Sequence, residues 1–123
     1  MISPEDPGWP ELKERVRRAL WELASWGGRQ GYEEFASTIE GVSARSGHFH
    51  RMLDQIDRDE HAQQRCLLSA VVAKAGRYGI PGEGFFNCAR DLGYAVDDQR
   101  AFWKAELERV HDQARGKPCP PLD

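Results

Sequence analysis

Apolar residues recur at steps of three and four along much of the chain, which is the spacing of one face of an α-helix. The first such stretch begins near Pro10, a residue favoured in the first turn of a helix, and runs to about Trp26, where two glycines follow. Four more helices are predicted, over about residues 32–40, 48–58, 85–92 and 98–114. The pattern therefore predicts a largely helical protein.

The polar positions between these apolar stripes are expected to face water. In the first helix they include Arg17, in the third Asp57, and in the last Glu106. Each long helix is thus expected to dock one face on a common core and to leave its charged face exposed.

One apolar run, Cys66–Ala73, has the character of a strand. It is too short for most packed helices, is β-branched at its centre and ends shortly before Gly76. It is predicted to be a strand buried on both faces. Because a lone strand leaves its backbone groups unpaired, it needs a partner. The candidates are Arg29–Tyr32, Tyr78–Pro81 and the same strand of a second copy.

These elements predict a single α+β domain, predominantly helical, with about five helices around one short buried β-strand or hairpin. A winged-helix-like arrangement is one version of this fold. The globular domain is expected to span residues 10–114. Residues 1–9 are expected to be a flexible N-terminus, and residues 115–123, which contain three prolines, a flexible C-terminal tail.

Composition limits the class of protein further. The chain has 123 residues, 40% hydrophobic and 30% charged, which is typical of one globular domain. No run approaches the ~20 apolar residues needed to span a bilayer, so no membrane contact is expected. The start of the chain lacks a signal-peptide pattern, and its three cysteines show no CxxC spacing. A cytoplasmic location is therefore expected, without a disulfide framework.

A local basic surface is the main candidate for a binding site. The net charge of −3 gives no overall attraction to nucleic acid, so such binding requires a local patch. The predicted nucleic-acid-binding residues are Arg45, His48, His50 and Arg51 around the start of the third helix, and Lys74 and Arg77 in the turn after the strand. If both groups face the same way, the helix enters a groove and the turn contacts the phosphate backbone. Acidic residues from Asp54 to Glu60 count against this arrangement.

The alternative is a protein-interaction or oligomerisation module, such as an inhibitor or adaptor, with no nucleic-acid contact. Exposed aromatic side chains would then meet a protein partner or form a homodimer, and Trp21, Trp26 and Phe49 are the candidates. Salt-dependent retention on DNA would favour the first function, whereas salt-insensitive self-association would favour the second.

Catalysis and cofactor binding find little support in the sequence. The residues of metal-ligand type are His48, His50, His61, Cys66 and Cys88. The first two lie two positions apart on a helix and therefore diverge. The glycine-rich run 76–84 precedes a helix start, but it fits neither a P-loop nor a dinucleotide fingerprint, and Glu83 sits where a phosphate would bind. Ser69 lacks the strained turn of a nucleophile elbow. No catalytic residue, metal or cofactor is predicted.

Several segments together resemble a family of small bacterial domains of uncharacterised role. The matching segments are Tyr-Glu-Glu-Phe-Ala at 32–36, Leu-Leu-Ser-Ala-Val-Val at 67–72, Pro-Gly-Glu-Gly-Phe-Phe at 81–86, Ala-Arg-Asp-Leu-Gly at 89–93 and Phe-Trp-Lys-Ala-Glu-Leu at 102–107. The resemblance spans about Tyr32 to Val110. It implies an accessory role in a bacterial DNA-processing or defence system.

A fainter similarity is to the winged-helix domain of alkylguanine DNA alkyltransferases. The Tyr32 helix carries it, together with Val71 and Val72 before a glycine-bearing turn. The reactive Pro-Cys-His-Arg of that family would fall on Leu67–Ala70, which puts Leu68 at the position of the nucleophile. The similarity therefore implies a DNA-facing helix but no alkyl transfer.

Overall fold

The structure is a computed structural model that describes residues 1–75 and 79–122. Within these residues it has five α-helices, a short 3-10 helix and two very short strands. In chain order they are α1 (Trp9–Ser25), β1 (Gln30–Gly31), α2 (Tyr32–Ala36), α3 (Gly47–Ala62), η1 (Leu68–Val71), β2 (Val72–Ala73), α4 (Glu83–Asp91) and α5 (Gln99–Ala114). The prediction of an α+β fold that is predominantly helical is confirmed.

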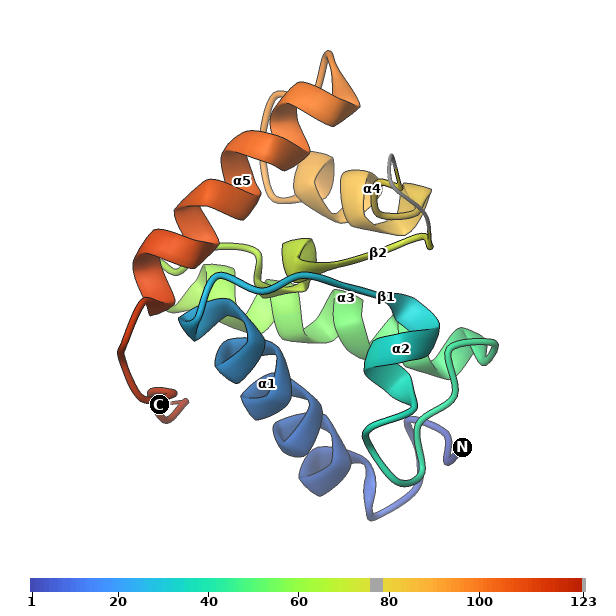
Figure 1. The fold of residues 1–123 in the computed structure, drawn as a ribbon. Coiled ribbons are helices and arrows are strands. Elements are labelled where there is room, and N and C mark those ends of the chain that lie inside the picture. Colours follow the sequence, from blue (N-terminus) through green and yellow to red (C-terminus); the bar gives the residue numbers. More distant parts are fainter. Residues whose placement is uncertain (76–78, 123) are drawn as a thin grey trace.

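The segment from η1 to β2 runs through the middle of the molecule, and the helices pack around it (Figure 1). α1, α3 and α5 all contact η1, α1 also packs against α5, and α4 packs against α3. Every residue from Leu67 to Ala73 is buried. The core is therefore organised around this one segment.

The two strands form a parallel pair, with Gln30 opposite Val72 and Gly31 opposite Ala73. Arg29–Tyr32 is thereby confirmed as the partner of the central segment. A wing is an antiparallel hairpin, whereas the strand pair within residues 1–75 and 79–122 is parallel. Because residues 76–78 after β2 lie outside the described residues, the winged-helix-like version of the fold stays a prediction.

The predicted strand Cys66–Ala73 is wrong over much of its length, because Leu68–Val71 is coiled into η1 and only Val72–Ala73 is paired in the sheet. Side chains of α3 and α5 take the place of a neighbouring strand. The N–H groups of Cys66, Leu67 and Ser69 donate to Gln113 (2.8 Å), Glu106 (2.7 Å) and Asp57 (2.9 Å), and the indole of Trp103 donates to the carbonyl of Ala70 (2.8 Å). Since these backbone groups are satisfied by side chains, they need no strand ladder.

Several charged side chains that the sequence pattern places in water are buried. Arg17, Asp57 and Glu106 are each 1% exposed or less. Arg17 bonds Glu14 of its own helix at 2.7 Å, and it lies 3.7 Å from Glu60 of α3, which is also buried. Buried charges are tolerated where they are paired. The pairing of Arg17 with Glu60 joins α1 to α3 inside the protein.

Both ends of the chain, for which the sequence predicts flexibility, make defined contacts. Trp9 is buried, and Ile2 packs against the core. After α5, hydrogen bonds join residues 116–120 to α1. The packed unit therefore extends beyond residues 10–114 on both sides.

Candidate functional site

Among the sequence-predicted basic residues, those near the start of α3 have acidic neighbours. Near the start of α3, the side chain of Arg45 is exposed and lies 3.7 Å from Glu33 of α2. Local backbone hydrogen bonding lowers the pKa of the Glu5 carboxyl, and nearby Arg51 and His48 lower it further. Acidic neighbours therefore oppose three of the predicted cations at this end of α3.

The remaining predicted residues make other contacts. The Nε2 atom of His50 lies 3.0 Å from the carbonyl of Ala44, and its ring packs edge-on against Tyr32 with ring centres 4.9 Å apart. Lys74 is exposed just after β2, and its backbone N–H donates to the carbonyl of Ile80. Arg77, the sixth predicted residue, lies outside the described residues.

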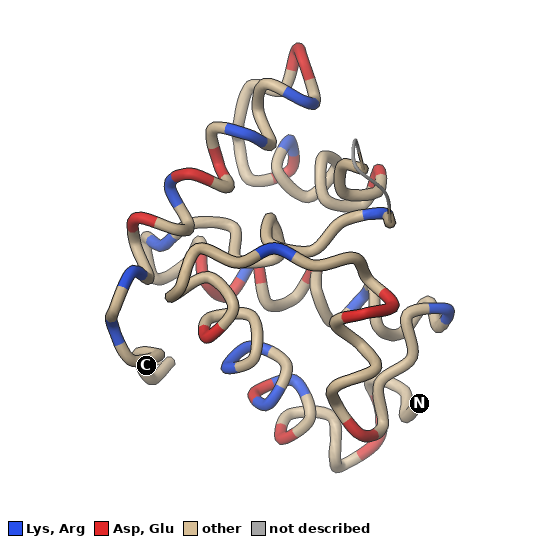
Figure 2. The backbone as a smooth tube through the Cα atoms, in the orientation of Figure 1, with Lys and Arg blue, Asp and Glu red and all other residues tan. Residues whose placement is uncertain are grey.

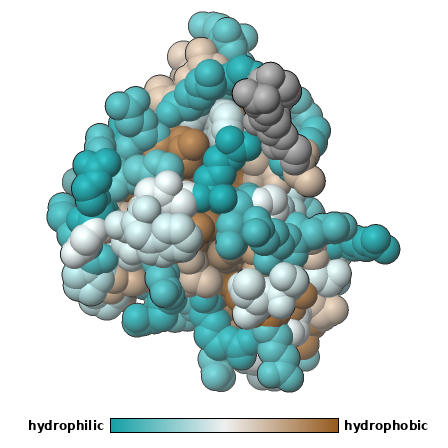
Figure 3. Space-filling model, in the orientation of Figure 1, coloured by the Kyte–Doolittle hydropathy of each residue, from teal (hydrophilic) through white to brown (hydrophobic). Residues whose placement is uncertain are grey.

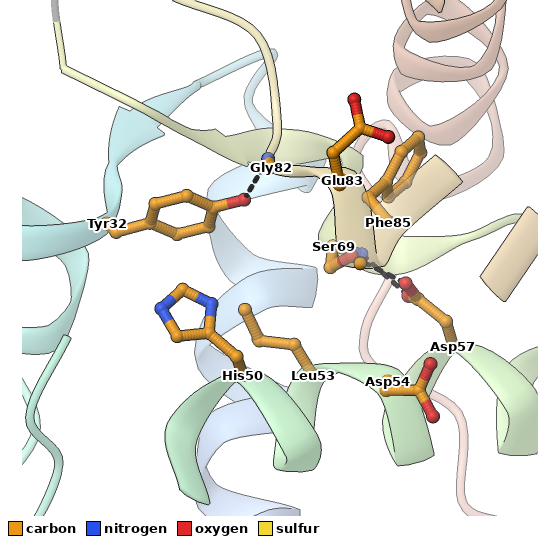
Figure 4. A pocket seen from close by; sticks show the side chains of 10 residues that line it. Tyr32, His50, Leu53, Asp54, Asp57, Ser69, Gly82, Glu83 and Phe85 are labelled. Carbon is orange, nitrogen blue, oxygen red and sulfur yellow. Dashed lines mark hydrogen bonds between the residues drawn. The ribbon is translucent and has the colours of Figure 1, made fainter. Parts of the chain in front are cut away.

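His50 lines a pocket of about 280 Å³ whose walls include residues of α2, α3 and the start of α4 (Figure 4). We call it the Tyr32 pocket, and its polar lining is Tyr32, His50, Asp54, Asp57, Ser69 and Glu83. Three of the segments that carry the family resemblance meet here, because they contribute Tyr32, Ser69 and Gly82–Phe85. The fold thus brings residues far apart in the sequence to one cavity.

Asp57 and Ser69 form a buried pair in this pocket. Asp57 accepts hydrogen bonds from the backbone N–H of Ser69 at 2.9 Å and from its hydroxyl at 2.5 Å. The pKa of Asp57 is raised to about 7, chiefly by burial; the two bonds from Ser69 oppose the rise, and nearby Asp54 and Glu106 contribute to it. The Ser69 hydroxyl is held by a carboxylate and not by a histidine. The pair therefore anchors the start of η1 and does not form a serine–histidine couple.

The Tyr32 pocket is acidic, but its carboxylates already have partners. Besides Asp57, it contains Asp54, which accepts a hydrogen bond from Arg58 at 2.8 Å, and Glu83, which accepts one from Gln99 at 3.0 Å. Carboxylates repel an anion, so the start of α4 does not favour phosphate. This agrees with the reading of Glu83 from the sequence.

The side chains of metal-ligand type are dispersed. His61 packs against Tyr94 with ring centres 5.6 Å apart, while Cys88 is buried against α3. In the part of the chain that the structure describes, no three or more His, Cys, Asp or Glu side chains are grouped so as to hold a metal ion.

A second concave surface carries cations that the sequence-based prediction does not include. A groove of about 500 Å³ lies between α5 and the residue before β1, and it is lined by Arg29, Arg100, Lys104, His111 and Arg115, with Trp103, Leu107, Glu108 and Asp112 among them. We call it the cationic groove. Lys and Arg recur along α5, interleaved with acidic residues (Figure 2). The face shown in Figure 3 is mainly hydrophilic around small hydrophobic hollows.

Arg29 forms the wall of the cationic groove opposite α5. Its guanidinium lies over the ring of Trp103, 5.0 Å from the ring centre, and its Nη2 donates to the carbonyl of Gly79 at 3.1 Å. The cation–π contact and the hydrogen bond hold this side chain in place. The bond to Gly79 also connects the groove to the turn after β2, which contains Lys74.

The sequence does contain a signal for this groove. Arg100, Lys104, His111 and Arg115 follow one another at steps of four, seven and four, which places them on one face of a helix. Arg29 has no such signal, because only the folded chain brings it to α5.

Comparison with protein-family models, with curated proteins and with solved structures found no match to this chain. The family resemblance described above therefore stays an expectation. Among the helices of the described residues, none is long and apolar enough to cross a membrane.

Proposed function

We propose that this chain is a non-enzymatic nucleic-acid-binding module and that its cationic groove contacts the phosphate backbone. The observation that carries the proposal is the concentration of Arg29, Arg100, Lys104 and Arg115 on one concave surface of a chain with a net charge of −3. Phosphate contacts from arginine and lysine supply most of the affinity of non-specific nucleic-acid binding. A chain whose net charge does not attract nucleic acid requires a local cationic patch to bind it.

The construction of the groove favours contact with the backbone over recognition of bases. Trp103 is buried beneath Arg29, so its ring is not offered to a stacking base. Glu108 and Asp112 interrupt the row of cations, and Asp112 pairs with Arg115 at 3.0 Å. We therefore expect moderate affinity that depends strongly on salt and weakly on sequence. The family resemblance supports an accessory role in a bacterial DNA-processing or defence system.

Two matched double variants test this proposal. K104Q/R115Q changes the cationic groove, and R45Q/R51Q changes the surface predicted from the sequence; all four side chains are exposed. Binding to mixed-sequence duplex DNA and to RNA is measured at several salt concentrations. The groove variant should bind more weakly and reduce the slope of log K against log salt by about 1.8 for duplex DNA. R45Q/R51Q should match the wild type.

Weaker binding by R45Q/R51Q alone would move the interface to the start of α3. No binding of the wild type to DNA or RNA at low salt would overturn the nucleic-acid proposal altogether. Equal, small losses in both variants would show that the protein has no defined interface, and would also contradict it.

A protein-interaction module is the second candidate function, and the exposure of Trp26 favours it. This side chain is 68% exposed, whereas the other two predicted contact residues, Trp21 and Phe49, are buried. The prediction of an aromatic contact surface is therefore wrong for Trp21 and Phe49, which are core residues. Mass in solution across a concentration range tests a homodimer. A salt-insensitive dimer that Trp26→Ser abolishes would support it, and a monomer at every concentration would rule it out.

A further inference from the structure

Residues 116–122 run along α1 after the end of α5 (Figure 1). Their sequence restricts their shape. Pro118, Pro120 and Pro121 have φ fixed near the polyproline II value, and each residue that precedes a proline is pushed towards the same region. A polyproline II helix has about three residues per turn and no internal hydrogen bonds. Its carbonyls are therefore free, and those three residues apart face the same side.

α1 binds two carbonyls with this spacing. The indole Nε1 of Trp21 donates to the carbonyl of Lys117 at 3.0 Å, and Nη2 of Arg17 donates to the carbonyl of Pro120 at 2.7 Å. Arg17 and Trp21 are four residues apart in α1, so they lie one above the other on the same face. We call this face the Arg17–Trp21 site.

Arg17 is held in position for this contact from within the protein. Glu14 accepts hydrogen bonds from Nε and Nη2 of Arg17 at 2.9 and 2.7 Å, and Glu60 lies 3.7 Å from Nη1. The side chain is 1% exposed, and within the described residues Nη1 has no hydrogen-bond partner. The carbonyl of Pro120 gives Nη2 of this buried guanidinium an acceptor in addition to Glu14, whereas Nη1 stays without a hydrogen-bond partner among the described residues even with the segment in place.

Recognition at the Arg17–Trp21 site is directed at main-chain atoms. Both acceptors are backbone carbonyls, so the two contacts do not depend on which side chains the bound segment carries. A hollow of about 320 Å³ adjoins the segment and is lined in part by Trp21, Ser25 and Pro118. A different segment with the same proline spacing therefore has the groups needed to bind in the same way.

We propose that the Arg17–Trp21 site is a docking site for a proline-rich segment of a partner protein, which residues 116–122 of this chain occupy in cis. Proline-rich segments bind aromatic-bearing surfaces well because their backbone is already ordered. A tethered segment has a high effective concentration, so a partner binds only by displacing it. The inference does not rest on nucleic-acid binding.

The test weakens the tethered segment within the full chain. The variant P118G/P120G keeps both carbonyl acceptors but loses the restricted backbone, which should weaken docking about two- to fivefold per substitution. The probe is a labelled synthetic peptide with the sequence of residues 116–122 and Ser in place of Cys119. Fluorescence polarisation should show roughly tenfold tighter binding of this peptide to P118G/P120G than to the wild type.

Two controls identify the contact. In the P118G/P120G background, Trp21→Phe keeps an aromatic ring but removes the indole donor, and it should weaken peptide binding by about five- to tenfold. A peptide with Ala in place of each Pro should bind P118G/P120G much more weakly than the proline peptide. The indole N–H resonance of Trp21 in a ¹⁵N spectrum reports the same hydrogen bond directly.

A folded P118G/P120G chain that does not bind the proline peptide would overturn the proposal, and so would equal binding of the alanine peptide. If the glycine substitutions unfold the chain, the wild type at millimolar peptide decides the question. The proline peptide, and not the alanine peptide, must then shift the Trp21 indole resonance. A concentration-dependent dimer of the wild type that Trp21→Phe abolishes would assign the site to a second copy of this chain and overturn the assignment to a partner.

Discussion

The phenolic oxygen of Tyr32 accepts a hydrogen bond from the backbone N–H of Gly82 at 2.9 Å. Tyr32 is the first residue of α2, and Gly82 directly precedes α4, so this bond joins two helices across the Tyr32 pocket (Figure 4). Burial raises the pKa of Tyr32, although the bond from Gly82 opposes the rise. The phenol therefore remains protonated and acts as a neutral acceptor.

Replacing Tyr32 by Phe should destabilise the protein by about 1–2 kcal/mol, because the N–H of Gly82 loses its acceptor in a partly buried position. Tyr94→Phe is the matched control, since the Tyr94 hydroxyl makes only a long contact of 3.5 Å with Nδ1 of His61. Its cost should stay below about 0.5 kcal/mol. Urea unfolding measures both. Equal losses in the two variants would contradict a specific role for the bond between Tyr32 and Gly82.

The buried Asp57 predicts a pH dependence of stability. Its folded-state pKa is raised from 3.8 to about 7 by burial. Between pH 3.8 and about 7 the folded protein keeps a proton on Asp57 that the unfolded chain has released. Raising the pH therefore favours the unfolded chain, and the stability that protonated Asp57 contributes is lost as the pH rises. The free energy of unfolding should fall by up to about 1.4 kcal/mol per pH unit from this group. Asp57→Asn should flatten the profile, because an amide does not titrate in this range, and the amide can still hydrogen-bond Ser69.

Asp59→Asn is the matched control for Asp57→Asn. Asp59 lies on the same helix, has a side chain that is 40% exposed, and pairs with Lys13 at the surface. Chemical unfolding at a series of pH values should give the wild-type slope for this variant. A wild-type slope in Asp57→Asn as well would show that other groups cause the pH dependence.

Helix positions could be predicted from the sequence because apolar periodicity is a local property. The predicted first helix ends at about Trp26 and the observed α1 ends at Ser25, and α4 covers Glu83–Asp91 where the sequence predicts a helix over residues 85–92. Side-chain exposure could not be predicted at Asp57, because its burial depends on the backbone of Ser69, which arrives from another part of the chain. Polar residue type alone places such a carboxylate in water.

The misassigned strand has the same cause. A β-branched apolar run such as residues 66–73 is typical of a strand, and this assignment assumes that its backbone groups pair with another strand. Here Glu106 and Trp103 supply an acceptor and a donor to that backbone from α5. A single run of sequence holds no information on these distant side chains, so the 3-10 turn could not be predicted from it.

The site predicted from the sequence combines two groups, around the start of α3 and in the turn after β2, and within each group the residues are neighbours in the sequence. Arg45 and Arg51 are close along the chain, and the structure gives each an acidic neighbour, Glu33 for the first and Glu5 for the second. The cationic groove instead combines α5 with Arg29, which lies far from α5 in the sequence. Such a surface follows from the packing of α1 against α5 and from the pairing of the strands.

Trp103 provides a third stability prediction. Its indole N–H donates to the buried carbonyl of Ala70 at 2.8 Å. Trp103→Phe should cost about 2–4 kcal/mol, since it removes buried ring volume and leaves that carbonyl without this donor. Trp26→Phe is the matched control, and its exposed position predicts a change within about 0.5 kcal/mol. Urea unfolding of the two variants checks the difference, and similar values would mean that the bond to Ala70 contributes little.

The three cysteines should differ in their reactivity towards iodoacetamide. Cys88 is 1% exposed, and the pKa of its thiol is raised to about 12, chiefly by burial and also by nearby Asp57 and Asp54. Because the thiolate is the reacting species, Cys88 should be labelled only as fast as the protein unfolds at pH 8. Burial also raises the pKa of Cys66 and Cys119, but both are partly exposed and should react faster.

Peptide mass spectrometry measures the labelling rate of each cysteine, and labelling in urea provides the reference at which the three thiols become equivalent. Labelling of Cys88 in the native protein as fast as that of Cys119 would contradict its buried position.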